Sequence, residues 1–195
     1  MTDTYREVRN VGADARSILL RRRYAATVDD VWHACTDPDR LKRWFLPVTG
    51  DLRAGGTFQL EGNAGGEILT CEPPRRLRVT WVYGDGPSSE VEVRLSASGP
   101  EETIVELEHG PVPTVVEMDG RRIDVILNDP QTGIWGMGTG WDMGLAALDA
   151  FLRGELPATT DPAALESNPQ IIEMANNSGA AWAEAVAAAA EKAKA

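Results

Sequence analysis

Histidine is the side chain that most often carries out general acid–base catalysis, and this sequence contains two, His33 and His109. His109 ends the alternating segment "TIVELEHG" on the same side as Val105 and Leu107, and the alternation in "LRVTWVYG" places Tyr83 on the inward side of its strand. His109 and Tyr83 are therefore the candidate catalytic residues. His109 has two interpretations, a general base that faces the interior or a hydrogen-bonded structural histidine.

Other catalytic and metal-binding patterns are not found. The sequence has no nucleophile elbow, and its histidines, cysteines and carboxylates lack metal-ligand spacing, so we predict neither a metal nor another cofactor. The glycines of "GMGTG" do not open a strand–turn–helix unit with a downstream acid, and Gly55-Gly56 precedes a strand, which favours a turn or bulge. Cys71 is interpreted as a small buried hydrophobe. Cys35 and Cys71 lie far apart in the sequence without metal-ligand spacing, which favours reduced thiols and a cytoplasmic location.

Large apolar side chains offer a different chemistry, because an apolar pocket binds small molecules through them. The alternative is that the same residues fill a packed core. The candidate ligand-binding residues are Trp44, Phe45, Phe58, Leu60, Trp81, Leu107, Trp141, Leu145 and Leu148.

The elements that position these residues follow from periodicity. A strand is predicted over residues 17–26, followed by a short helix with Thr27 as its N-cap and a second one that ends at Phe45. The next segments alternate with period two, which indicates antiparallel strands with one dry face and one wet face. The wet face is expected to hold cross-strand ion pairs among Arg78, Arg94, Glu90, Glu92, Glu106 and Glu108.

Three further segments complete the chain. Asp119-Gly120 predicts a hairpin within residues 111–133, and Trp141, Leu145, Leu148 and Leu152 recur at helical spacing in the long helix that ends near Gly154. An Ala-rich helix closes the sequence. Because one helix does not always fill the hollow of a strongly bent sheet, we expect an internal cavity between that sheet and the long helix.

Composition excludes several functions. The 195 residues suggest one domain with appendages, and a net charge of −11 disfavours binding to nucleic acid or to an anionic membrane. No segment approaches the apolar length of a membrane span, and the N-terminal residues lack the apolar stretch of a signal peptide.

Five segments, taken in order, resemble a known family. They are "VDDVWHACTDPDRLKRWF", "DLRAGGTFQLEG", "EPPRRLRVTW", "TIVELEHG" and "GWDMGLAALDAFLRG". Together they resemble the START-like (SRPBCC, Bet v 1-like) superfamily, in the bacterial branch related to the activator of the Hsp-90 ATPase. The resemblance implies an α+β helix-grip fold, in which a curved antiparallel sheet wraps around a long C-terminal helix. It also implies a pocket that binds lipids, polyketides or other apolar molecules.

This resemblance sets the expected domain organisation. Residues 1–16 form an N-terminal segment, residues 17–154 the START-like domain with a hairpin insertion at 111–133, and residues 155–195 a helical extension. "NNSGAAWAEAVAAAA" resembles the extension of a bacterial subgroup.

Three functions remain open. The first is non-catalytic binding of a lipid- or polyketide-like molecule between sheet and helix. The second is a polyketide cyclase-like enzyme that uses a pocket acid or base. The third is a chaperone- or partner-interaction module, and the Ala-rich tail adds a possible homodimer.

Overall fold

The computed structural model describes residues 4–118, 120–129, 135–156 and 168–194. The strands are β1 (Tyr5–Val11), β2 (Ala15–Tyr24), β3 (Val48–Gly50), β4 (Thr57–Leu60), β5 (Gly65–Glu72), β6 (Arg76–Trp81), β7 (Ser89–Gly99), β8 (Glu102–Pro113), β9 (Val115–Met118) and β10 (Arg121–Asp124). The helices are α1 (Val28–Thr36), α2 (Pro38–Trp44), α3 (Met137–Leu152) and α5 (Pro169–Lys192).

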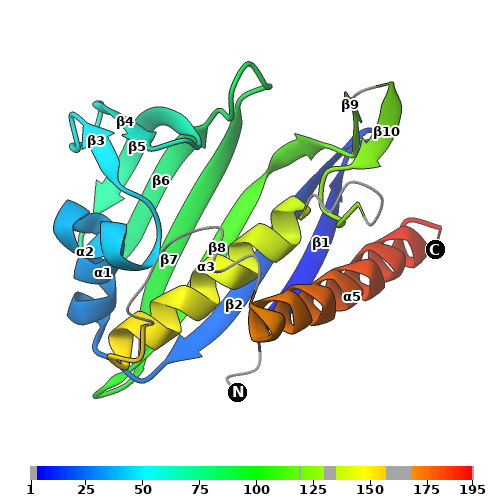
Figure 1. The fold of residues 1–195 in the computed structure, drawn as a ribbon. Helices are drawn as coiled ribbons and strands as arrows, with labels where there is room; N and C mark the ends of the chain where they lie inside the picture. Colours follow the sequence, from blue (N-terminus) through cyan, green and yellow to red (C-terminus); the bar gives the residue numbers. More distant parts are fainter. Residues whose placement is uncertain (1–3, 119, 130–134, 157–167, 195) are drawn as a thin grey trace.

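Eight of the strands form one antiparallel sheet in the order β1-β2-β8-β7-β6-β5-β4-β3. Figure 1 shows this sheet curving around α3, which lies across its concave face. The α+β helix-grip architecture predicted from the sequence is confirmed.

Alternation along the strands separates the two faces of the sheet as predicted. Ile18, Leu20, Val105 and Leu107 are buried on the inner face and form the core with Leu148 of α3. The outer face carries a lattice of ion pairs across neighbouring strands. Its cross-strand pairs include Arg78–Glu90, Arg76–Glu92, Arg94–Glu106, Arg94–Glu108 and Arg21–Glu106.

The two short helices begin where their caps predict. The Thr27 side chain accepts a hydrogen bond from the backbone N–H of Asp30 at the start of α1. Asp37 caps α2 by accepting from the backbone N–H groups of Asp39 and Arg40, and Pro38 occupies the first turn. The chain therefore turns sharply between α1 and α2.

The hairpin predicted around Asp119-Gly120 is present as the antiparallel pair β9–β10, in which Val116 faces Ile123. Asp119 itself and residues 130–133 of the predicted insertion lie outside the described residues. Gly120 has a φ of +72°, a conformation that glycine adopts without a steric penalty.

No strand was expected within residues 1–16, but β1 lies there and pairs along its length with β2. The Ala-rich helix α5 lies beside β1 and α3 in the same chain (Figure 1). Its Trp182 is fully buried.

Asp142 of α3 joins these three elements. Its Oδ2 accepts hydrogen bonds from Arg6 Nε of β1 at 2.8 Å, from Trp182 Nε1 of α5 at 2.9 Å and from the Ser178 hydroxyl. We call Asp142, Arg6, Ser178 and Trp182 the clasp. It ties α3 to β1 and α5 through buried hydrogen bonds.

The helices were also compared with the length and hydropathy of a membrane span. Within the described part of the chain, no helix is both long and apolar enough to cross a bilayer.

Candidate functional site

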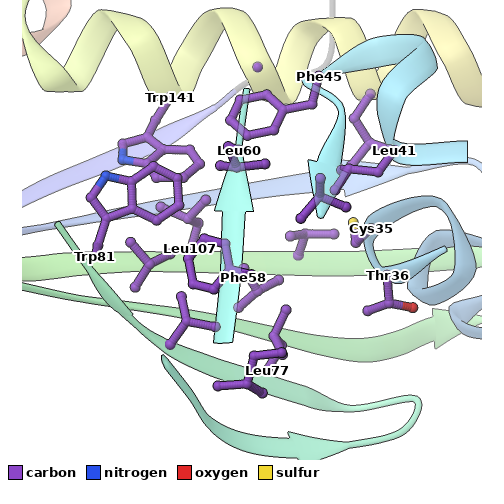
Figure 2. Close-up of a pocket in the computed structure, with 18 of the residues that line it drawn as sticks. Cys35, Thr36, Leu41, Phe45, Phe58, Leu60, Leu77, Trp81, Leu107 and Trp141 are labelled. Atoms are coloured by element: carbon purple, nitrogen blue, oxygen red, sulfur yellow. The ribbon is translucent and has the colours of Figure 1, made fainter. Parts of the chain in front are cut away.

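A cavity of about 170 Å³ lies between α3, the inner face of the sheet and the two short helices. Figure 2 shows its wall, to which α1, α2, α3 and strands from β3 to β8 contribute. The expected cavity is therefore present. The sheet strands and α3 hold its side chains on regular elements, which makes the wall rigid.

All nine residues predicted as ligand-binding line this cavity, although their role toward a ligand remains a prediction. They are Trp44, Phe45, Phe58, Leu60, Trp81, Leu107, Trp141, Leu145 and Leu148. Helical periodicity brings the last three to one stripe of α3, and period-two alternation brings Phe58, Trp81 and Leu107 to the inner face of three different strands.

Five of these side chains form a continuous aromatic row. The ring centroids are 5.5 Å apart for Trp44 and Phe45, 6.1 Å for Phe45 and Trp141, 5.2 Å for Trp141 and Trp81, and 6.1 Å for Trp81 and Phe58. The row spans α2, α3, β6 and β4. It gives the cavity large aromatic surfaces that rigid elements present from several directions.

The end of α2 explains how Trp44 and Phe45 reach the cavity together. Trp44 is the last residue of the helix, and its indole Nε1 donates a 2.9 Å hydrogen bond to the carbonyl of Ala34 in α1. Phe45 follows as the C-cap and stacks on Trp141 of α3. The two aromatic side chains thus bridge the short helices and the long helix.

His109 lies directly behind the aromatic row rather than in the cavity lining. Its side chain is 4% exposed and contacts the rings of Trp81 and Trp141 edge-on. Trp141 Nε1 donates to His109 Nδ1 at 2.9 Å, so the opposite nitrogen, Nε2, carries the proton and donates to the Ser89 hydroxyl at 2.9 Å. Ser89 in turn donates to the carbonyl of Trp81 at 3.1 Å.

We call this chain of hydrogen bonds, from Trp141 through His109 and Ser89 to the carbonyl of Trp81, the His109 relay. It uses both nitrogens of the His109 ring in its neutral form. Burial lowers the pKa of His109 to about 4, well below its ordinary value of 6.5. Because the only lone pair of the ring accepts from Trp141, none is left to take a proton from a bound molecule. Of the two interpretations offered for His109, the geometry favours the structural one.

Tyr83 does not belong to the site, and its predicted inward orientation is wrong. Strand β6 ends at Trp81, Val82 makes only an isolated bridge to Gly65, and the Tyr83 side chain is 64% exposed. The alternation that places Trp81 inward does not continue past the end of the strand.

Further lining residues were placed on the inner face by alternation but were not named as a site. Leu77, Val79, Val91, Val93 and Val105 are of this kind. Others had no sequence signal that named them: Cys35 and Thr36 of α1, Leu41 of α2, Val48 of the short strand β3, Leu52 of a loop and Gly144 of α3. Cys71 also lines the cavity, and both cysteines are free thiols.

The described residues were also searched for metal ligands. Among them, no three or more histidines, cysteines or carboxylates are grouped so that they could hold a metal ion.

Comparisons with known proteins agree with this geometry. The family model described as "Activator of Hsp90 ATPase homolog 1-like protein" (AHSA1) matches residues 25–153. The chain belongs to this family. The match begins just before α1 and ends just after α3, so the AHSA1-like region contains the whole cavity lining. The resemblance drawn from the five segments is confirmed.

Solved structures with the AHSA1/SRPBCC fold extend the likeness to nearly the whole chain. CalU16 from Micromonospora echinospora is 40% identical in its crystal structure, over 95% of this chain and 98% of CalU16, with a TM-score of 0.68. Its solution structure is 41% identical over 97% of both chains, with a TM-score of 0.73. The likeness therefore includes α5 as well as the matched family region.

A third structure shares the fold at lower identity. DynU16, described as a protein in the dynemicin biosynthetic locus, is 24% identical over 74% of this chain and 50% of its own, with a TM-score of 0.58. None of the curated proteins matches the chain.

Proposed function

We propose that this protein binds an apolar small molecule in the cavity between α3 and the sheet, without transforming it. One observation carries the proposal: the cavity lies in an otherwise packed core and is walled almost entirely by aliphatic and aromatic side chains. An unfilled volume of this size costs on the order of 4 kcal/mol at about 24 cal/mol per Å³. A ligand that fills the cavity recovers part of that free energy.

The test is direct binding of a neutral, environment-sensitive fluorophore, for which we choose prodan. We expect saturable binding at one site per chain, with a blue shift of the emission. Val93→Phe, which adds a ring to the cavity wall, should abolish it. Leu69→Phe is the matched control, because Leu69 lies on β5 outside the lining and is 38% exposed.

Both variants are checked by circular dichroism before titration, and Cys71→Phe blocks the cavity from another strand if Val93→Phe does not fold. Equal binding to a folded blocked variant and to the control would place the fluorophore elsewhere and remove the proposal.

The hypothesis of a cyclase-like enzyme has no comparable support from the residues of the site. Its discriminating feature is a pair of ionisable groups inside the pocket, but Tyr83 is exposed and His109 is committed to Trp141 and Ser89. Replacing both residues and assaying turnover remains its test.

The interaction module rests on the family description, which names the Hsp90 ATPase. In this chain the Ala-rich helix α5 packs against the chain's own β1 and α3, and its Trp182 is buried there. A homodimer stays a prediction, and light scattering on the full chain and on a chain that ends near Pro157 tests it.

A further inference from the structure

The cavity provides no partner for a charge. Among the described residues that line it there is no aspartate, glutamate, lysine, arginine or histidine. Burial raises the pKa of the Cys35 thiol to about 12, so this group stays neutral at physiological pH. A carboxylate, sulfonate or phosphate that entered would lose its hydration and gain no ion pair, which costs several kcal/mol.

The polar side-chain groups of the wall are largely committed to the protein. The Thr36 hydroxyl donates to the carbonyl of Trp32, and the indole N–H groups of Trp44 and Trp141 donate to Ala34 and His109. The indole N–H of Trp81 has no acceptor in the described part of the chain. The site therefore tolerates at most an occasional uncharged acceptor, such as a carbonyl oxygen.

The volume limits the size of the occupant. An engineered apolar cavity of about 150 Å³ holds benzene, whereas pockets for drug-sized molecules are about 300–1,000 Å³. At about 170 Å³, this cavity is close in volume to the first of these, which favours a compact ring system over a long acyl chain. It approaches the surface at Leu52, a lining residue that is 40% exposed.

The aromatic row favours planar rings. Trp141 and Phe45 lie beneath α3 with Trp81 next to Trp141, and Leu77 lies on the opposite side of the cavity (Figure 2). The His109 relay fixes the orientation of the Trp141 ring before any ligand arrives. Such a preorganised wall gives an aromatic ligand stacking or edge contacts without an ordering cost.

We propose that the natural occupant of the cavity is a compact, electrically neutral molecule of one or two aromatic rings, and that anionic and long-chain analogues are excluded. This inference rests on the proposed function, since it concerns the ligand of the same site.

Competition against prodan tests the charge requirement. Methyl 2-naphthoate and 2-naphthoate share a ring system and differ in charge at pH 7.5. We expect the ester to displace prodan at least about 30-fold more effectively than the carboxylate, since that ratio corresponds to roughly 2 kcal/mol. If the ester and the carboxylate displace prodan equally well, and neither binds Val93→Phe, the charge requirement is wrong. The proposed function would still stand.

Dodecanol tests the size and ring requirement, because it is neutral and long. We expect it to displace prodan more weakly than methyl 2-naphthoate. If it competes as well as the ester at the wild-type site and not in Val93→Phe, the compact-ring inference is wrong. If prodan, ester and dodecanol all fail to bind the folded wild-type chain, both this inference and the proposed function fall.

Discussion

The neutral state of His109 makes a defined contribution to stability as a function of pH. Its Nδ1 accepts from Trp141, so a proton there would set two N–H groups against each other. Burial lowers the pKa of His109 to about 4, whereas an unfolded chain titrates near the ordinary value of 6.5. Below pH 6.5, His109 therefore binds a proton in the unfolded state but not in the folded state. The free energy of unfolding falls as the pH falls.

The size of the effect follows from the difference between the two pKa values. Each pKa unit corresponds to about 1.4 kcal/mol, so the loss between pH 7 and pH 5 is about 2 kcal/mol. It reaches about 3 kcal/mol at pH 4, where the folded state also begins to take up the proton.

Urea denaturation followed by circular dichroism at pH 7, 6 and 5 measures this loss. His109→Asn removes the titrating group but keeps a carbonyl oxygen near the position of Nδ1 to accept from Trp141. Between pH 7 and pH 5, the free energy of unfolding of the wild type should fall by about 2 kcal/mol more than that of His109→Asn. His33→Asn is the matched control, because His33 is the second histidine and is exposed on α1.

Two outcomes would refute this reasoning. In one, wild type and His109→Asn lose stability in parallel between pH 7 and pH 5, so that the buried ring is not titrating as its surroundings require. In the other, His33→Asn removes the pH dependence instead.

The remaining predictions concern two glycines of α3 and one arginine of the outer face. Gly138→Ala should destabilise the protein by about 1–3 kcal/mol in urea denaturation, because the added Cβ would lie 2.6 Å from the Trp182 ring; no loss would contradict the docking of α5. Gly144→Ala should stabilise it by up to about 1 kcal/mol, since its Cβ would lie 3.6 Å from the Phe45 ring in ordinary contact; a loss would mean that Phe45 is packed more tightly than the structure has it. Arg94→Met should lower stability by about 1 kcal/mol at low salt and by less at ~1 M NaCl, and an effect independent of salt would count against the ion-pair lattice.

The sequence predicted the inner wall of the site well, because the physical signal there is local. Side chains along a strand point alternately to its two faces, so the pattern of apolar and polar neighbours shows which ones point inward. This alternation placed Phe58, Trp81 and Leu107 correctly. The same rule failed at Tyr83. A strand ends where its hydrogen-bonding partners end, and the pattern of β6 alone does not show that Val82 keeps only one bridge.

Residues 5–11 and the tail helix were poorly predicted for a different reason. Strand β1 has one buried apolar side chain, Val8, so its sequence shows little alternation. Its place in the sheet depends on pairing with β2 and on α5, which comes from the far end of the chain. The clasp joins Arg6 to Asp142, 136 residues apart, and no local pattern reveals such a contact.

The clasp and the His109 relay together explain how the cavity persists. Unfilled volume favours collapse of α3 toward the sheet, by about 4 kcal/mol for a cavity of this size. Neighbouring residues of α3 are held at two places: Asp142 is bound by β1 at the edge of the sheet and by α5, and Trp141 is bound by His109 of β8. Displacing the helix would break or distort these hydrogen bonds, at about 1–3 kcal/mol for each buried group left unpaired. These contacts therefore fix the position of α3 over the sheet, and with it the cavity between them.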